Sequence, residues 1–112
     1  QRKAKSKGLP WSLSKGFDGA APVSPIEPIA DFGDLQALSF ALDVNGETRQ
    51  SGDTSLMLYT FAQLLAYLTR FMTLEPGDLI FTGTPAGVAS VKPGDHLVAS
   101  IAGKPMLDIK VV

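Results

Sequence analysis

Hydroxyl groups and glycines gather in Thr-Gly-Thr-Pro-Ala-Gly-Val at residues 82–88. We expect the apolar residues 79–81 before them to form a short buried strand. A buried strand that ends in a polar, glycine-rich loop delivers side chains to a ligand site. Gly83 lets backbone N–H groups approach a bound anion, and Thr82 and Thr84 add hydroxyl donors. The same residue types also suit an ordinary tight turn, so the pattern leaves both interpretations open.

Lys15 is a second candidate, because it lies among apolar and small residues. If the segment is extended, Leu13 and Phe17 share its face and could line a pocket that holds the ammonium group against an anion. The alternative is a solvated lysine, which is the usual state of this residue type.

The other titratable residues favour structural roles. His96 is the only histidine and stands beside a turn at the start of a strand, where we expect solvent exposure. Asp53, Asp78 and Asp95 also lie beside turns, where aspartate commonly accepts hydrogen bonds from nearby backbone. We therefore predict no complete metal site among these residues.

A β-hairpin is the clearest element in the middle of the chain. Residues 38–44 alternate apolar and polar side chains, as in a half-buried strand. Asn45-Gly46 is a favoured type I′ turn, and residues 47–50 return as the partner strand.

One helix is predicted over residues 61–72, where apolar residues recur at helical spacing and Thr60 and Gln63 fit a capping box. Residues 9–33 are rich in proline and glycine and exclude a long helix, although residues 22–26 could form an edge strand.

Two Pro-Gly-Asp sequences, at 76–78 and 93–95, predict type II turns that each precede a strand. After the second, residues 96–101 and 106–112 are expected to pair as antiparallel strands joined through 103–105. Several strands with one helix indicate a β-rich α+β fold.

Composition sets wider limits. With 112 residues and 45% hydrophobic content, we expect a single domain, 1–112, with a sizeable core. A net charge of −1 implies neither nucleic acid nor an anionic membrane as partner. The absence of cysteine favours a reducing compartment, and we expect a cytoplasmic location. A basic, helix-favouring run that begins at Gln1 without a capping signal and ends at Gly8 leads us to expect a fragment.

Five segments together resemble the fumarylacetoacetate hydrolase family, over essentially the whole chain and in the correct order. They are Gly-Leu-Pro-Trp-Ser-Leu-Ser-Lys-Gly-Phe (8–17), Val-Asn-Gly-Glu-Thr-Arg-Gln (44–50), Asp-Thr-Ser (53–55), Leu-Glu-Pro-Gly-Asp (74–78) and the loop 82–88. The first segment is most similar to the small acylpyruvate hydrolase and oxaloacetate decarboxylase type.

The resemblance implies a mixed β-sandwich roll, incomplete here at its N-terminus, and a homodimer. It also implies a Mg²⁺ or Mn²⁺ ion and cleavage of a carbon–carbon bond in short keto acids through an enolate. By position, Lys15 matches the pocket lysine that neutralises developing negative charge. Thr84 matches the loop threonine that binds the substrate, with Gly83 supplying close backbone approach.

The chain also departs from the family pattern at identifiable positions. The family's metal ligands and water-activating dyad precede the lysine segment and are absent here, and Gly19 replaces a threonine of larger members. We expect the fragment alone to be inactive and its parent to be an enzyme. Two alternatives stay open: an isomerase or decarboxylase of 2-hydroxy-diene-dioates, and a non-catalytic β-rich binding module if the chain is natively this short.

Overall fold

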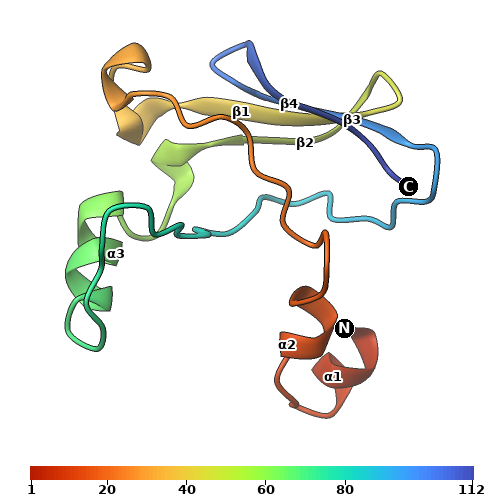
Figure 1. Ribbon diagram of the computed structural model, residues 1–112, viewed down its shortest axis with the longest axis horizontal. Helices are drawn as coiled ribbons and strands as arrows, with labels where there is room; N and C mark the ends of the chain where they lie inside the picture. The colour runs from red at the N-terminus through yellow and green to blue at the C-terminus, as the bar shows by residue number, and fades with distance from the viewer.

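The computed structural model describes residues 1–112, and a four-stranded antiparallel sheet forms one side of it, at the top of Figure 1. The strand order is β2-β1-β3-β4, with β1 at Ser39–Val44, β2 at Glu47–Asp53, β3 at His96–Ile101 and β4 at Lys104–Lys110. The helical segments are α1 (Arg2–Ser6), α2 (Ser12–Lys15), α3 (Phe61–Leu68) and the 3₁₀ turns η1 (Ile29–Asp31), η2 (Leu35–Ala37) and η3 (Thr54–Leu56). The predicted β-rich α+β class is confirmed.

The β1–β2 hairpin forms as predicted, and it contains one irregularity. Asn45 and Gly46 have φ values of 55° and 82°, the left-handed conformation that a type I′ turn requires. Leu42 pairs with Gln50, but the next residue of β1 pairs with Thr48. Arg49 is therefore the extra residue of a β-bulge, which bends the strand and alters the direction of neighbouring groups.

The β3–β4 hairpin differs from its prediction at the turn. Ala102 and Gly103, with φ values of 49° and 76°, make the connection by themselves. Lys104 and Pro105 consequently belong to β4 and not to the loop. Proline cannot donate a ladder hydrogen bond, but β4 is an edge strand and Pro105 lies where the register shifts, so the residue is accommodated there.

Helix α3 begins as predicted and ends early. The Thr60 hydroxyl accepts a hydrogen bond from the Gln63 N–H at 3.2 Å, and Gln63 Oε1 accepts one from the Thr60 N–H at 2.8 Å. This reciprocal pair is the expected capping box. The helix ends at Leu68 and not near Met72, and the chain continues through turns.

Two expected strands, at 22–26 and 79–81, are absent. The residues of the second stay in coil, with Leu79 53% and Phe81 72% exposed. A strand requires a neighbour to complete its hydrogen bonds, and residues 79–81 form no ladder with either edge strand, β2 or β4. Residues 79–92 instead cross below the sheet as the teal-to-cyan coil of Figure 1.

This coil is fitted closely against β2 at Gly87. A Cβ at that position would collide with the Arg49 carbonyl oxygen and lie 3.1 Å from Cγ of Gln50. Gly87 also has a φ of 101°, which other residues rarely adopt. The bulge and the glycine together let the two backbones touch.

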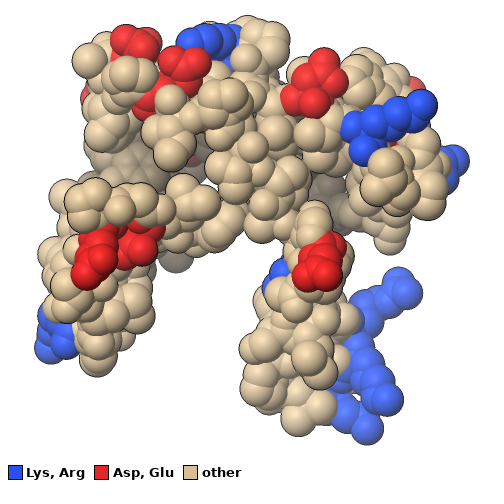
Figure 2. Space-filling model, viewed as in Figure 1, with Lys and Arg blue, Asp and Glu red and all other residues tan.

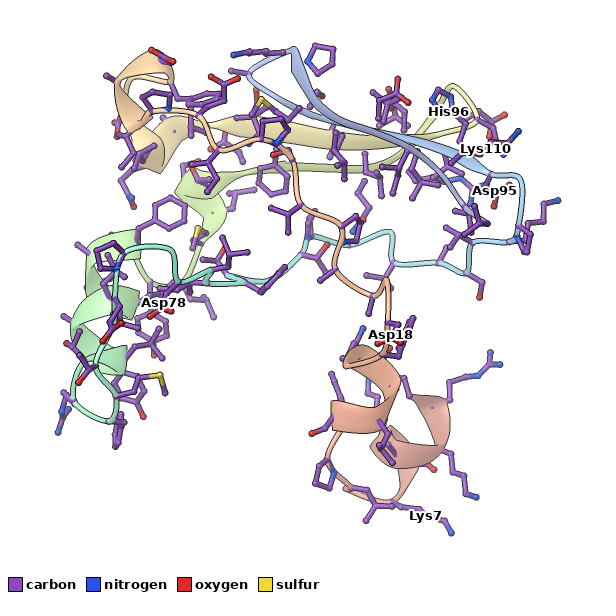
Figure 3. The ribbon with its side chains drawn as sticks, in the orientation of Figure 1. Lys7, Asp18, Asp78, Asp95, His96 and Lys110 are labelled. Atoms are coloured by element: carbon purple, nitrogen blue, oxygen red, sulfur yellow. The ribbon has the colours of Figure 1, made fainter.

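A hydrogen-bonded corner joins the β1–β2 turn to the start of β3, where Figure 3 labels Asp95 and His96. Asn45 Nδ2 donates to one oxygen of the buried Asp95 at 3.0 Å, and the Lys92 N–H donates to the other at 2.9 Å. The Asn45 side-chain oxygen accepts from the His96 N–H at 2.9 Å. The hydrogen bond from Asn45, followed by that from Lys92, holds the pKa of Asp95 below its usual range.

The expected sizeable core is wrong. Only Val44, Thr54 and Asp95 are buried, and the accessible surface is 8865 Å². A compact protein of 11.8 kDa would expose about 5,900 Å². Helices α1 and α2 form one arm and α3 another, separated by a gap (Figures 1 and 2). No helix combines the length and apolar character that crossing a membrane requires.

We predict that Gly87→Ala destabilises the polypeptide that contains these residues more than Gly77→Ala does. Gly77 has a similar φ of 103° but open space around it, so alanine there costs only backbone strain, about 1–2 kcal/mol. Alanine at 87 adds a steric clash, which costs a further 1–3 kcal/mol or so. Urea denaturation measures both, and equal losses would contradict the close contact with Arg49.

Asp95 should make the free energy of unfolding depend on pH in the acid range. Because its pKa is lowered in the folded state, its contribution is present above the unfolded value of about 3.9 and is lost as pH falls through the folded value. The stability gap between the parent and Asp95→Asn should therefore stay constant above about pH 5 and narrow as the pH falls from there to about 2. A gap that stays constant over this range would rule out the assigned role.

Candidate substrate-binding groove

A groove of about 640 Å³ lies between the loop after residue 81 and the C-terminal end of β2. The loop contributes residues 82–86, and β2 with its following turn contributes residues 51–54. Apolar side chains complete the lining: Phe40, Leu56, Met57, Leu58 and Leu64, with Tyr59 at the same face. The groove thus combines an apolar wall with a hydroxyl-rich loop, as small-molecule sites commonly do.

The predicted loop residues lie together at this groove. Thr82, Gly83 and Thr84 all line it, and Thr84 is exposed. Gln50 Nε2 donates to the Thr84 hydroxyl oxygen at 2.8 Å and to the Pro85 carbonyl at 3.0 Å. Gly83 has a φ of 112° with open space where a Cβ would point, so the backbone conformation, and not crowding, requires glycine.

The charge at the groove is negative. Asp53 is the only acidic residue in the lining, and no lysine, arginine or histidine is present there. Hydrogen bonds from Ser55, first its hydroxyl and then its N–H, hold the pKa of Asp53 below its usual range. The groove therefore offers hydroxyl donors for an anion, and the compensating positive charge has to come from another part of the structure.

Lys15 does not supply that charge within these 112 residues. It is the last residue of α2, is exposed, and lines neither this groove nor the smaller one beside Arg49. The segment is helical and not extended, so Leu13 and Phe17 do not form the apolar pocket considered above; they are 95% and 64% exposed. The structure does not bring Lys15 and Thr84 together, and their meeting in one pocket stays a prediction.

His96, Asp78 and Asp95 lie apart from the groove. The expected exposure of His96 is confirmed: its Nε2 lies 2.7 Å from Asp108, at the end of the sheet opposite Asp53 (Figure 3). Asp53, Asp78 and Asp95 each accept a nearby backbone N–H, also as predicted. No group of three or more acidic or histidine side chains could hold a metal ion.

Gln50 is the residue at this site that the sequence interpretation missed. It lies in the return strand of the hairpin and in the family segment 44–50, but the sequence analysis gives it no role at the site, because its neighbours in sequence do not relate it to a loop 34 residues later. The groove wall at Asp53 and residues 56–59 was missed for the same reason.

Comparison with known proteins agrees with the motif series. The family model described as the fumarylacetoacetate (FAA) hydrolase C-terminal domain matches residues 1–112. The rat protein named oxaloacetate tautomerase FAHD1, mitochondrial, is 45% identical over 99% of this chain and 50% of its own length. The chain thus spans about half the length of the curated relatives it matches.

Solved structures agree in fold. A fumarylacetoacetate hydrolase family protein from Yersinia pestis CO92 superposes with a TM-score of 0.92 at 40% identity, covering 100% of this chain and 51% of that one. The fumarylpyruvate hydrolase of Pseudomonas aeruginosa, solved with Mn²⁺ and pyruvate, gives 0.89 at 38% identity, with 100% and 48% coverage. The chain belongs to the fumarylacetoacetate hydrolase family.

Proposed function

We propose that these residues form the substrate-binding part of an enzyme that acts on short 2-keto acids through an enolate. The reaction is carbon–carbon bond cleavage, by acylpyruvate hydrolysis or oxaloacetate decarboxylation, or the related keto–enol exchange. Oxaloacetate, fumarylpyruvate and pyruvate, which the relatives' names contain, all carry a carboxylate beside a ketone. Each of the proposed reactions places negative charge on the ketone oxygen, and that charge needs donors.

The observation that carries the proposal is the exposed Thr84 hydroxyl at the rim of the groove. Thr84 and the adjacent Gly83 backbone would bind an oxygen of the 2-keto acid. The apolar wall would receive the rest of the substrate and exclude water from it. Thr82 lines the same groove, and we assign it a structural role.

We assign charge neutralisation to Lys15. The groove carries the Asp53 carboxylate and no cation, so an anionic substrate requires a positive group from another segment. Lys15 lies on an arm that makes little contact with the sheet, and its ammonium is not engaged in an ion pair. In the complete enzyme, packing of this arm would bring the ammonium to the substrate and stabilise the developing enolate.

A divalent ion, Mg²⁺ or Mn²⁺, is part of the proposal for the complete protein, supported by the Mn²⁺ in the Pseudomonas aeruginosa structure. The residues of this chain do not fit a complete site, because no three candidate ligands lie together. The ligands would therefore come from outside residues 1–112, and we derive no step through the ion.

The oligomeric state, the cellular location and the exact reaction of the complete protein are also proposals. We expect residues 1–112 to be inactive alone. We also expect them to belong to one catalytic domain of a homodimer, and sedimentation of the complete polypeptide measures this oligomeric state. We expect a reducing compartment, the cytoplasm on the basis of the cysteine-free composition, and cell fractionation tests this against the mitochondrial location in the rat relative's name. Assays with a 2-hydroxy-diene-dioate beside oxaloacetate and acetylpyruvate separate isomerase from hydrolase and decarboxylase.

In the complete polypeptide, Lys15→Met should lower kcat for oxaloacetate or acetylpyruvate by about 10²–10³-fold, because a charge-stabilising group is lost. Circular dichroism should show an unchanged fold. Lys7→Met, at an exposed lysine on the same arm (Figure 3), is the matched control and should keep full turnover. Parent-like turnover in Lys15→Met would remove Lys15 from the mechanism.

Thr84→Val should mainly raise KM, by about 5–10-fold, because it removes one hydrogen bond to the bound substrate. Thr69→Val, at an exposed threonine after α3, is the control and should leave KM unchanged. Steady-state kinetics separates the two constants. A loss confined to kcat would contradict ground-state binding by Thr84.

A further inference from the structure

The Thr84 hydroxyl oxygen is held by a hydrogen bond from Gln50. The side-chain nitrogen of Gln50 reaches two atoms of the loop, the Thr84 hydroxyl oxygen at 2.8 Å and the Pro85 carbonyl oxygen at 3.0 Å. Both amide hydrogens are thereby directed at the loop. Gln50 is half-buried; its bond to the Pro85 carbonyl is partly buried, whereas its bond to Thr84 is exposed.

The Pro85 carbonyl decides which way the amide is oriented. A carbonyl oxygen can only accept, so the group facing it must be the nitrogen of Gln50 and not the oxygen. The same nitrogen then donates to Thr84. Because the Thr84 oxygen is already accepting, its single proton is free to point into the groove as a donor.

The β-bulge explains why Gln50 reaches this loop. Arg49 is the unpaired residue between Thr48 and Gln50, so the strand bends there and its neighbours are redirected. The Arg49 carbonyl contacts Gly87, and Gln50 Cγ lies 3.1 Å from the same glycine's Cβ position. The loop is thus held against β2 on both sides of Pro85.

We propose that Gln50 is a positioning residue that keeps the Thr84 hydroxyl as a donor toward the groove. The inference rests on the proposed function of Thr84. It adds a preference in selection: Gln50 occupies one of the two lone pairs of the Thr84 oxygen and leaves the proton unused, so an acceptor such as a carboxylate or ketone oxygen is favoured at Thr84 over a group that must donate. Gln50 itself does not touch the substrate.

The test measures KM and kcat for oxaloacetate in the complete polypeptide. Gln50→Met keeps the length of the side chain and removes both hydrogen bonds, and KM should rise about 3–10-fold with kcat within about twofold. Gln50→Glu also keeps the size but accepts the Thr84 proton and adds negative charge, so KM should rise further, about 10–30-fold. Gln36→Met, which removes an amide away from the loop, is the control and should leave both constants unchanged.

A double-mutant cycle separates positioning from a general structural effect. If Gln50 acts through Thr84, then Gln50→Met should change KM by less than about twofold in a Thr84→Val background. If the KM increases of the two single variants multiply in the double variant, Gln50 does not act through Thr84. The inference about Gln50 is also overturned if KM is unchanged in both Gln50 variants while Thr84→Val raises it; in both cases the proposed role of Thr84 stands. An unchanged KM in Thr84→Val would overturn the proposed role of Thr84 and the inference with it.

Discussion

The extra residue at Arg49 is the constraint on which the candidate site depends. A regular β1–β2 ladder would continue the pairing of Leu42 with Gln50 residue by residue toward the turn, and the bulge interrupts it. The interruption bends β2 and brings its backbone to Gly87, where no side chain fits. The hydroxyl-bearing loop therefore lies at a fixed place beside the sheet, although it has no strand of its own.

The same architecture leaves much apolar surface uncovered. The total accessible surface, polar and apolar together, exceeds that of a compact protein of this size by about 3,000 Å², far more than the roughly 800 Å² that one partner buries in a standard interface. Few contacts join the N-terminal segment, which carries Lys15, to the sheet. In one of them, Nζ of Lys104 in β4 lies 3.0 Å from the Glu27 carboxylate and over the ring of Phe32. The proposed role of Lys15 in substrate binding therefore depends on a packing of this segment against the groove, which covering the exposed apolar side chains would favour.

The acidic residues are mostly used locally, and this shapes the chemistry that remains. Asp78 and Asp95 close the two Pro-Gly-Asp turns, and Asp53 caps the turn after β2. For Asp53 and Asp95, the hydrogen bonds that each carboxylate accepts stabilise its ionised form and hold its pKa below the usual range. The groove consequently carries neutral donors at its loop and a fixed negative charge at its other wall.

The sequence by itself determined the elements whose interactions span a few residues: the Asn45-Gly46 hairpin, the Thr60–Gln63 capping box and the local hydrogen bonds of the turn aspartates. Each depends on side-chain and backbone preferences that neighbours in sequence satisfy. Only the tertiary structure decided that residues 79–81 lack a partner strand and that Gln50 meets Thr84. These outcomes depend on strand register and on which surfaces meet, and a short segment of sequence contains neither.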